Sequence, residues 1–238
     1  MTQPHSSLTG RIAKFSDTLK RKLPIPQQVA QIIHDLIVSG ELAPGDRIIE
    51  SRLASRLGIG HPTVREALVA LEHQGLVVRR ANQGCVVTTL TEKEVLQILQ
   101  IRAQLELYAV ELATEGSTPE GLQDLVTASR EMTEAALGGD VEEFYRRDLN
   151  WHNTLWKLSD NAYLAKSLSQ LMIPLLAFCM LKNLKDAGMV EMVKSANGHQ
   201  CITDAIASGD AKVAKQIARE KFEEFGNQHL RGFNTNAS

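Results

Sequence analysis

The chain has 238 residues and a formal net charge of −2; 43% of its residues are hydrophobic and 23% are charged, the balance of an ordinary globular protein. Its apolar runs, such as 172–181, are shorter than the roughly twenty residues that a membrane-spanning helix needs. Its three cysteines lack the paired spacing of a disulfide framework or of a cysteine-based zinc site. We therefore expect a cytoplasmic protein of one or two domains with no membrane partner.

Charge is distributed unevenly along the chain. Residues 1–90 carry 11 Lys and Arg against 7 Asp and Glu, whereas residues 91–238 carry 15 against 21. A mildly basic first third joined to an acidic remainder is typical of a polyanion-binding module on a non-binding body. The difference alone is a weak indication.

Residues 24–90 begin with three predicted short helices, after an arm formed by residues 1–23. Apolar residues recur at helical spacing in three segments, which end at Gly40, Gly58 and Gly75. Pro62 suits the first turn of the third helix, because the amide hydrogen that proline lacks would be unpaired there. Only Gly58–His61 separates the second and third helices, which is the tight turn of a helix-turn-helix.

Two β-prone runs, Leu76–Arg80 and Cys85–Thr89, follow the third helix. They flank Ala81–Gly84 and so predict a hairpin with a short loop that contains glycine. Three short helices followed by a hairpin are the order of a winged helix-turn-helix. The alternative is a generic three-helix domain with an attached hairpin.

Residues 91–230 predict an all-helical bundle, followed by a polar tail at 231–238. The bundle opens with a capping box of Thr91 and Glu94, which satisfies free amides at the helix start. The next two helices begin at Thr118 and Asp140. Later helices are expected around Leu164–Leu175, over Met189–Ala207 and from Asp210 through Phe225. The fold class is therefore mainly α, with an N-terminal winged helix-turn-helix of three helices plus a small β-hairpin and a C-terminal all-α helical bundle.

Many spaced positions in the first domain carry a family resemblance. They are Gly40–Gly45, Glu50, Leu53–Ala54, Leu57–Gly58, Pro62–Leu68, Leu71, Gly75–Leu76 and Gly84. Together they resemble the DNA-binding domain of the GntR superfamily, over about Ile25–Val87. The helical remainder resembles the ligand-binding (FCD) domain of the FadR-like branch. The resemblance implies a homodimeric transcription regulator that binds a double-stranded DNA operator and a small-molecule effector.

The first turn of the third helix carries the side chains expected to meet DNA. A recognition helix enters the major groove with its N-terminus first, and His61, Thr63 and Arg65 lie at that end. Arg65 is the strongest candidate, because a guanidinium can bind guanine bidentately or clamp a phosphate. The alternative is a surface arginine paired with Glu66 or Glu50.

Other residues of this domain are expected to support DNA binding without reading bases. Arg52 and Arg56, on the preceding helix, suit phosphate contacts, which position the protein on the duplex. Gly84 lies at the expected wing tip, where the absence of a side chain lets the backbone approach the minor groove, or simply permits the turn.

One departure from the family pattern concerns Gly60–His61. Relatives usually place Ser or Thr followed by Arg at these two positions, so the hydroxyl that would cap the helix and an arginine that would read a base are both absent. We expect weaker binding or a different operator, with His61 supplying a contact.

Three residues of the second domain suggest a metal site. Asp148 and His152 are four residues apart on one predicted helix, so their side chains share a face, and His199 begins another helical stretch. FCD-type domains commonly hold a divalent metal such as zinc with one Asp and three His; these residues match three ligands, but Lys221 stands where the fourth is expected.

The substitution leaves three interpretations open. Three ligands plus water or effector hold a metal weakly; or Lys221, expected to point inward, replaces the metal's charge and binds an anionic effector directly. In the third, Asp148, His152 and His199 are core polar groups satisfied by hydrogen bonds.

Arg102 lies among apolar residues of the first helix of the second domain, and therefore needs a partner there. Glu106 or a bound carboxylate could be that partner. Relatives use an arginine here to hold organic acids, so the resemblance implies a small carboxylate effector held by Arg102, with Lys221 or a metal at its other end.

Two other functions compete with the regulator. The first is a metallohydrolase or lyase that uses Asp148, His152 and His199; against it, the sequence has no evident general base, nucleophile motif or phosphate loop. The second is a helical adaptor whose winged helix binds protein. For the regulator, two-fold pairing of the helical domains would match a palindromic operator with half-sites near one helical turn apart.

Overall fold

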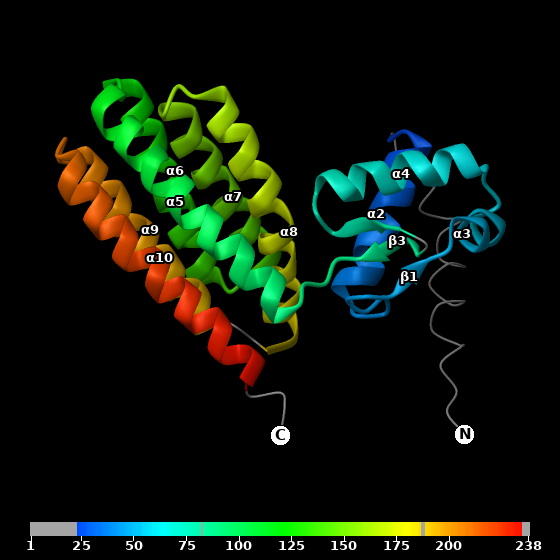
Figure 1. Cartoon of the computed structure of the whole chain (residues 1–238). Helices are drawn as coiled ribbons and strands as arrows, with labels where there is room; N and C mark the ends of the chain where they lie inside the picture. Colours follow the sequence, from blue (N-terminus) through cyan, green and yellow to red (C-terminus); the bar gives the residue numbers. More distant parts are fainter. Residues whose placement is uncertain (1–22, 82, 187–188, 235–238) are drawn as a thin grey trace. The chain divides into compact units, whose positions relative to one another are not determined.

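The computed structural model describes residues 23–81, 83–186 and 189–234 (Figure 1). The chain divides between Thr89 and Leu90 into two compact units. The arm expected over residues 1–23 lies outside the described residues except for Leu23, and so do residues 235–238 of the expected tail.

The described residues of the first unit form three helices and a small antiparallel sheet. Its helices are α2 (Ile25–Val38), α3 (Glu50–Leu57) and α4 (His61–His73); its strands are β1 (Arg47–Ile48), β2 (Val77–Arg80) and β3 (Gly84–Val87). The strand order is β1-β3-β2, with Val86 opposite both Arg47 and Val78. The predicted hairpin is confirmed, but β1 was not predicted, because two residues are too short for a period-2 pattern to register.

The core of the first unit lies between α2 and α4. The side chains of Val29, Ile33, Val64, Leu68 and Leu71 are completely buried. On α4 the buried positions recur at spacings of three and four residues, which is the period of a helix with one apolar face. The opposite face of α4 is left to solvent, and it carries the polar residues of the first turn.

The second unit is a bundle of long helices (Figure 1). They are α5 (Glu92–Gly116), α6 (Pro119–Gly138), α7 (Val141–Leu158), α8 (Ala162–Asp186), α9 (Met189–Ala207) and α10 (Ala211–Asn234). The predicted caps are present: Thr91 and Glu94 form the capping box, and the side chains of Thr118 and Asp140 accept backbone hydrogen bonds at the starts of α6 and α7. These local signals thus place three helix starts correctly.

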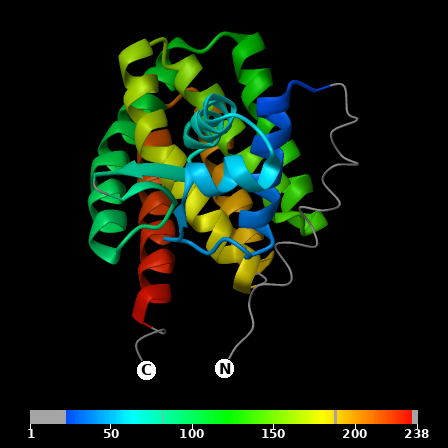
Figure 2. The same ribbon diagram turned by 90° about the vertical axis from the view of Figure 1, so that its right-hand side faces the viewer.

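The last helix is longer than the sequence predicted. It continues past Phe225 through Asn234, so residues 231–234 are helical and do not belong to a tail. Gly226 lies just after the predicted end of this helix, where α10 packs along α5 (Figure 2). A Cβ at Gly226 would lie 3.8 Å from Leu99 of α5, and this packing outweighs the poor helix propensity of glycine.

Aromatic residues of α7 form the centre of the bundle. Phe144, Trp151 and Trp156 are almost completely buried, together with Leu168 and Met172 of α8. By length and composition, residues 162–184 of α8 could cross a membrane, and half of the most apolar window is buried inside the unit. Because α8 packs against α5 and α7, we describe it as a core helix of the bundle.

Candidate functional site

The first turn of α4 projects polar side chains into solvent. His61 and Arg65 are exposed and Thr63 is partly exposed, while Val64 between them is buried. Gly60 is the N-cap residue and makes no side-chain cap hydrogen bond, which agrees with the missing hydroxyl noted in the sequence. The helix end is therefore accessible, and it places a guanidinium beside the positive end of the helix dipole.

Arg65 takes part in a surface network of charges. Its Nε lies 2.8 Å from Oε2 of Glu50, and its side chain is 67% exposed. Nη1 of Arg79 on β2 lies 3.6 Å from Oε1 of the same glutamate, and Nε of Arg79 lies 3.2 Å from Oε2 of Glu72. The alternative pairing with Glu50 is thus present, but an exposed ion pair contributes little stability and a phosphate can compete with it.

The remaining predicted DNA contacts of the first unit also lie at its surface. Arg52 and Arg56 are exposed on α3. Gly84 begins β3 with a φ of +76°, and no atom would lie within 4 Å of a Cβ there. Backbone conformation, and not crowding, is therefore what requires glycine at this position.

Within the second unit, the structure brings Asp148, His152 and His199 together in the buried interior. Nε2 of His152 lies 3.2 Å from Nε2 of His199 and 3.4 Å from Oδ1 of Asp148; Nε2 of His199 lies 3.5 Å from that oxygen. Three potential ligand atoms from α7 and α9 thus form a nearly equilateral triangle.

The spacing of this triangle fits a tetrahedral metal ion. Zinc bonds of about 2.0–2.1 Å in tetrahedral geometry separate the ligand atoms by about 3.3 Å. Oδ1 of Asp148 is buried and makes no hydrogen bond with any residue that the structure describes. Burial lowers the pKa of His152 and lowers that of His199 to about 4, so both rings are neutral at pH 7 and can act as ligands. Burial also raises the pKa of Asp148, and a bound cation would oppose that shift.

Neighbouring groups orient the two imidazole rings. Nδ1 of His199 lies 2.7 Å from the carbonyl oxygen of Ser195 and donates to it, which leaves the Nε2 lone pair directed at the cluster. The ring of Trp151 meets the His152 and His199 rings edge to face, with centroids 5.0 and 4.5 Å apart. Two lone pairs and a carboxylate oxygen at these distances repel one another unless a proton or a cation lies among them.

Arg102 and Glu106 of α5 form a buried ion pair beside the cluster. Nε of Arg102 lies 3.5 Å from Oε1 of Glu106, and that oxygen is 3.0 Å from Nδ1 of His152. Nε1 of Trp156 donates to Oε2 of Glu106 over 3.2 Å. Burial would raise the pKa of Glu106, but the neighbouring His152 and Arg102, together with the Trp156 hydrogen bond, hold it at about 2.

Glu106 is the site residue that the sequence underrated. It entered only as a possible partner of Arg102, yet its side chain is completely buried and it connects Arg102 of α5 to His152 and Trp156 of α7. The available signal was its position four residues after Arg102 on an amphipathic helix, where two charged side chains of opposite sign meet.

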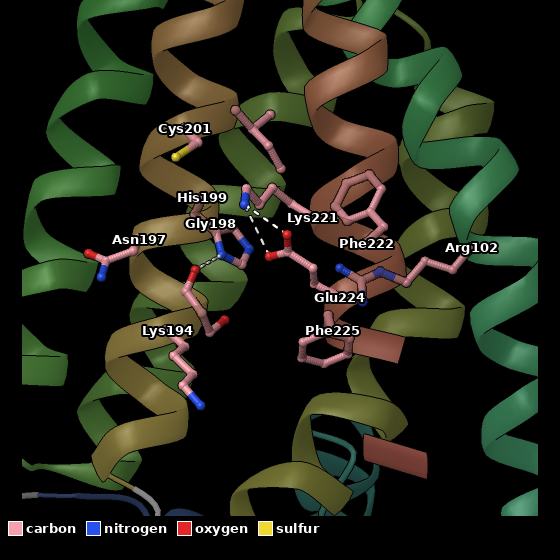
Figure 3. Close-up of a pocket in the computed structure, with 12 residues that line it drawn as sticks. Arg102, Lys194, Asn197, Gly198, His199, Cys201, Lys221, Phe222, Glu224 and Phe225 are labelled. Atoms are coloured by element: carbon pink, nitrogen blue, oxygen red, sulfur yellow. Dashed lines mark hydrogen bonds and ion pairs between the residues drawn. The ribbon is translucent and has the colours of Figure 1, made fainter. Parts of the chain in front are cut away.

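An open cavity of about 330 Å³ lies between α9 and α10 beside this cluster (Figure 3). Both Arg102 and His199 line it, so the cavity reaches the charged interior. Lys194, Lys221 and Glu224 also belong to its lining. The cavity therefore joins positive side chains to an edge of the candidate metal cluster.

Lys221 lines the cavity, and its aliphatic chain lies against Gly198 of α9. Its side chain is 28% exposed, and its Nζ lies 3.1 and 3.0 Å from the two carboxylate oxygens of Glu224 (Figure 3). The hydrogen bond to Glu224 raises the pKa of the Lys221 ammonium. The Lys221 ammonium therefore does not supply the net positive charge of a metal ion, because Glu224 neutralises it.

The two buried histidines predict that the metal-free helical domain is less stable in acid. An unfolded histidine takes up a proton near pH 6.5, but folded His199 does so only near pH 4. The unfolded state therefore binds more protons between these values, and the free energy of unfolding should fall as the pH decreases from about 6.5 to about 4. Urea unfolding of chelator-treated protein across this range measures the slope.

His199→Gln should flatten this profile, because glutamine cannot take up the proton. His61→Gln, which changes an exposed histidine of the other unit, should leave the profile as it is. A wild-type midpoint that does not move between pH 7 and pH 5 would contradict the expected protonation states.

Comparison with known proteins finds a matching family for each of the two units. The family described as "Bacterial regulatory proteins, gntR family" matches residues 26–87, and the FCD domain family matches residues 97–224. The uncharacterized HTH-type transcriptional regulator YdhC of Bacillus subtilis is 31% identical over 84% of this chain and 89% of its own length. The gluconate operon transcriptional repressor of the same species is 25% identical over 83% of this chain and 82% of its own length.

A solved structure has a similar fold. The structure of McbR/YncC from E. coli superposes with a TM-score of 0.68 at 23% identity, covering 89% of this chain and 99% of the other. The two relatives named above are transcriptional regulators and the matched family consists of regulatory proteins, and this decides against the enzyme that Asp148, His152 and His199 could otherwise have suggested. The chain belongs to the gntR family of bacterial regulatory proteins: it is a DNA-binding transcription regulator with an FCD domain.

Proposed function

We propose that this regulator binds its operator in the cytoplasm as a homodimer, and that a small carboxylate metabolite in the helical domain changes operator affinity. The observation that carries the proposal is the cavity between α9 and α10, which Arg102 and His199 line beside a buried metal-type cluster. A guanidinium next to a site for a divalent cation suits a carboxylate, because both groups bind its oxygens.

In the DNA half of the proposal, α4 is the recognition helix. His61, Thr63 and Arg65 contact base edges or the adjacent phosphates, since they lie in the first turn of α4 and reach solvent. Arg52 and Arg56 of α3 contact phosphates. The backbone at Gly84 approaches the minor groove from the tip of the wing.

The homodimer explains how effector binding reaches the DNA. Two-fold pairing of the helical domains sets the separation of the two α4 helices, and a palindromic operator matches that symmetry. An effector that prefers one arrangement of the helices changes the separation and hence the DNA affinity, to the extent of its differential affinity for the two arrangements. The gluconate operon relative is a transcriptional repressor, which supports repression as the direction of control.

In the helical half, Asp148, His152 and His199 hold a divalent metal such as zinc. The geometry favours this over the alternative in which Lys221 supplies the charge, because the three ligand atoms have tetrahedral spacing and the Lys221 charge is paired with Glu224. A metal bound there would supply a Lewis-acidic positive charge at the cavity, while Arg102 would hold the other end of the carboxylate. Lys221 contributes at the rim.

His199→Gln should reduce zinc affinity about 100-fold, because it removes one of the three ligands that the described residues supply. Competition with a chromophoric chelator measures the affinity of purified protein. His73→Gln, at an exposed position of α4, is the matched control and should bind zinc like the wild type. Equal zinc affinities of the two variants would support the interpretation in which the cluster is only a set of hydrogen-bonded core residues.

The regulatory proposal is tested by selecting genomic DNA fragments that bind the purified chain, with and without a panel of organic acids. We expect a palindromic motif, a steep loss of affinity with rising salt, and a shift in affinity with at least one acid. Calorimetric titration with the same acids should lose its signal in Arg102→Ala. Absence of duplex binding at low salt would overturn the DNA half, and equal binding of acid by Arg102→Ala would remove Arg102 from the effector site.

A further inference from the structure

Arg102 contacts the ring nitrogen of His152 that would bind a metal ion. Its Nη2 lies 3.1 Å from Nε2 of His152, the atom that also faces Asp148 and His199. A guanidinium can only donate hydrogen bonds, so it donates to the Nε2 lone pair, and the ring proton of neutral His152 then sits on Nδ1, near Glu106. The lone pair that completes the ligand triangle is thus taken by a cation of the protein itself.

Arg102 and a metal ion cannot share this lone pair. A nitrogen that accepts a hydrogen bond from a guanidinium has no second lone pair to offer, and two cations around one buried nitrogen repel each other strongly. Arg102 must therefore leave His152 before that ring can become a ligand. The site has two exclusive states, one with Arg102 on His152 and one with Arg102 displaced.

The cavity gives the displaced guanidinium a place to go. Arg102 already lines the cavity, and its Cζ lies 5.3 Å from the ring centroids of both Phe222 and Phe225 on α10 (Figure 3). Nε of Arg102 faces Glu106. A rotation about the outer bonds of the arginine side chain can therefore move Nη2 away from His152 and keep the ion pair with Glu106. Aromatic faces on the cavity side would stabilise the rotated guanidinium.

We propose that Arg102 couples the metal cluster to the cavity. It blocks His152 in the metal-free protein and turns into the cavity when the cluster is loaded, where its freed nitrogens bind an anionic group. Because linkage is reciprocal, an anion that holds Arg102 in the cavity also raises metal affinity by the same factor. This inference rests on the proposed metal site and adds an order of events: the effector site is complete only after metal loading.

The first test compares zinc affinities of variants. Arg102→Met removes the competing donor and charge and should bind zinc about ten-fold more tightly than the wild type, or tighter still. Arg147→Met is the matched control, because Arg147 lies in the same bundle but pairs with Glu131 and Glu143. An Arg102→Met affinity equal to or below that of Arg147→Met would overturn the proposal.

The second test uses the wild-type chain and does not depend on how the variant folds. The Nε–H signal of Arg102, assigned by through-bond correlation to its own backbone, is followed by ¹⁵N NMR. Zinc should shift this signal, and acetate, as the minimal carboxylate, should shift it again in the zinc-loaded protein at concentrations that have no effect on the zinc-free protein.

Three results would overturn the coupling: zinc binding that leaves the Arg102 signal unmoved, acetate binding that is the same with and without zinc, and no acetate response in either form. Operator binding is measured separately on the same preparations. A chain that binds duplex DNA but fails these tests loses only the coupling, whereas failure to bind duplex DNA removes the DNA half of the proposed function and leaves these measurements valid.

Discussion

Arg65→Met is expected to lower the affinity for operator DNA by about 10- to 100-fold and to leave the stability of the protein nearly unchanged. The affinity should fall because a guanidinium in the first turn of a recognition helix contributes about 1–3 kcal/mol through base or phosphate contacts, and each 1.4 kcal/mol is about a factor of ten. The stability should not fall, because the ion pair that Arg65 forms with a described residue, Glu50, is an exposed one. Fluorescence anisotropy with labelled duplex DNA and thermal unfolding measure the two quantities.

Arg130→Met is the matched control for this variant. Arg130 lies on α6 in the other unit, its side chain is 69% exposed against 67% for Arg65, and it also faces a glutamate. The two variants lose the same charge from equally exposed positions, so general electrostatic attraction to DNA falls similarly in both. If both bind DNA equally well, α4 is not the element that meets DNA.

Glu106→Gln is expected to destabilise the helical domain by about 3 kcal/mol. The substitution keeps the shape and an acceptor for Trp156, but it leaves the buried guanidinium of Arg102 without a counter-charge. Removing one partner of a buried ion pair typically costs about 3–5 kcal/mol, because the other charge stays desolvated. Urea unfolding followed by tryptophan fluorescence suits the measurement, since Trp151 and Trp156 are both buried in this unit.

Glu111→Gln provides the comparison on the same helix. Glu111 is 35% exposed and pairs with Lys215 of α10 over 2.7 Å. An ion pair so exposed is worth about 0–1 kcal/mol, so this variant should unfold at nearly the wild-type urea concentration. Equal destabilisation of the two variants would mean that the Arg102–Glu106 pair stabilises no more than a surface pair does.

Local features of the chain determine most of the fold. The spacing of Val64, Leu68 and Leu71 predicts α4 and its buried face, and Thr91, Thr118 and Asp140 mark three helix starts where their side chains do cap. Such features are readable from sequence because they join residues within three or four positions of each other. Strand β1 and the last turns of α10 were missed because pairing with β3 and packing against α5 decide them, and these partners are distant in sequence.

The same distinction between local and distant contacts applies to the candidate site. The sequence by itself determined that Asp148 and His152 share a helix face, that Arg102 needs a partner, and that a polar helix end carries Arg65, because each follows from helical spacing. Only the tertiary structure decided that His199 completes a triangle with Asp148 and His152, that Lys221 lines a cavity together with residues of α9, and that Arg102 reaches His152. The physical reason is that these contacts join residues of different helices, α5, α7, α9 and α10. The close packing of the interior sets their distances, and the spacing of residues along a single helix does not predict them.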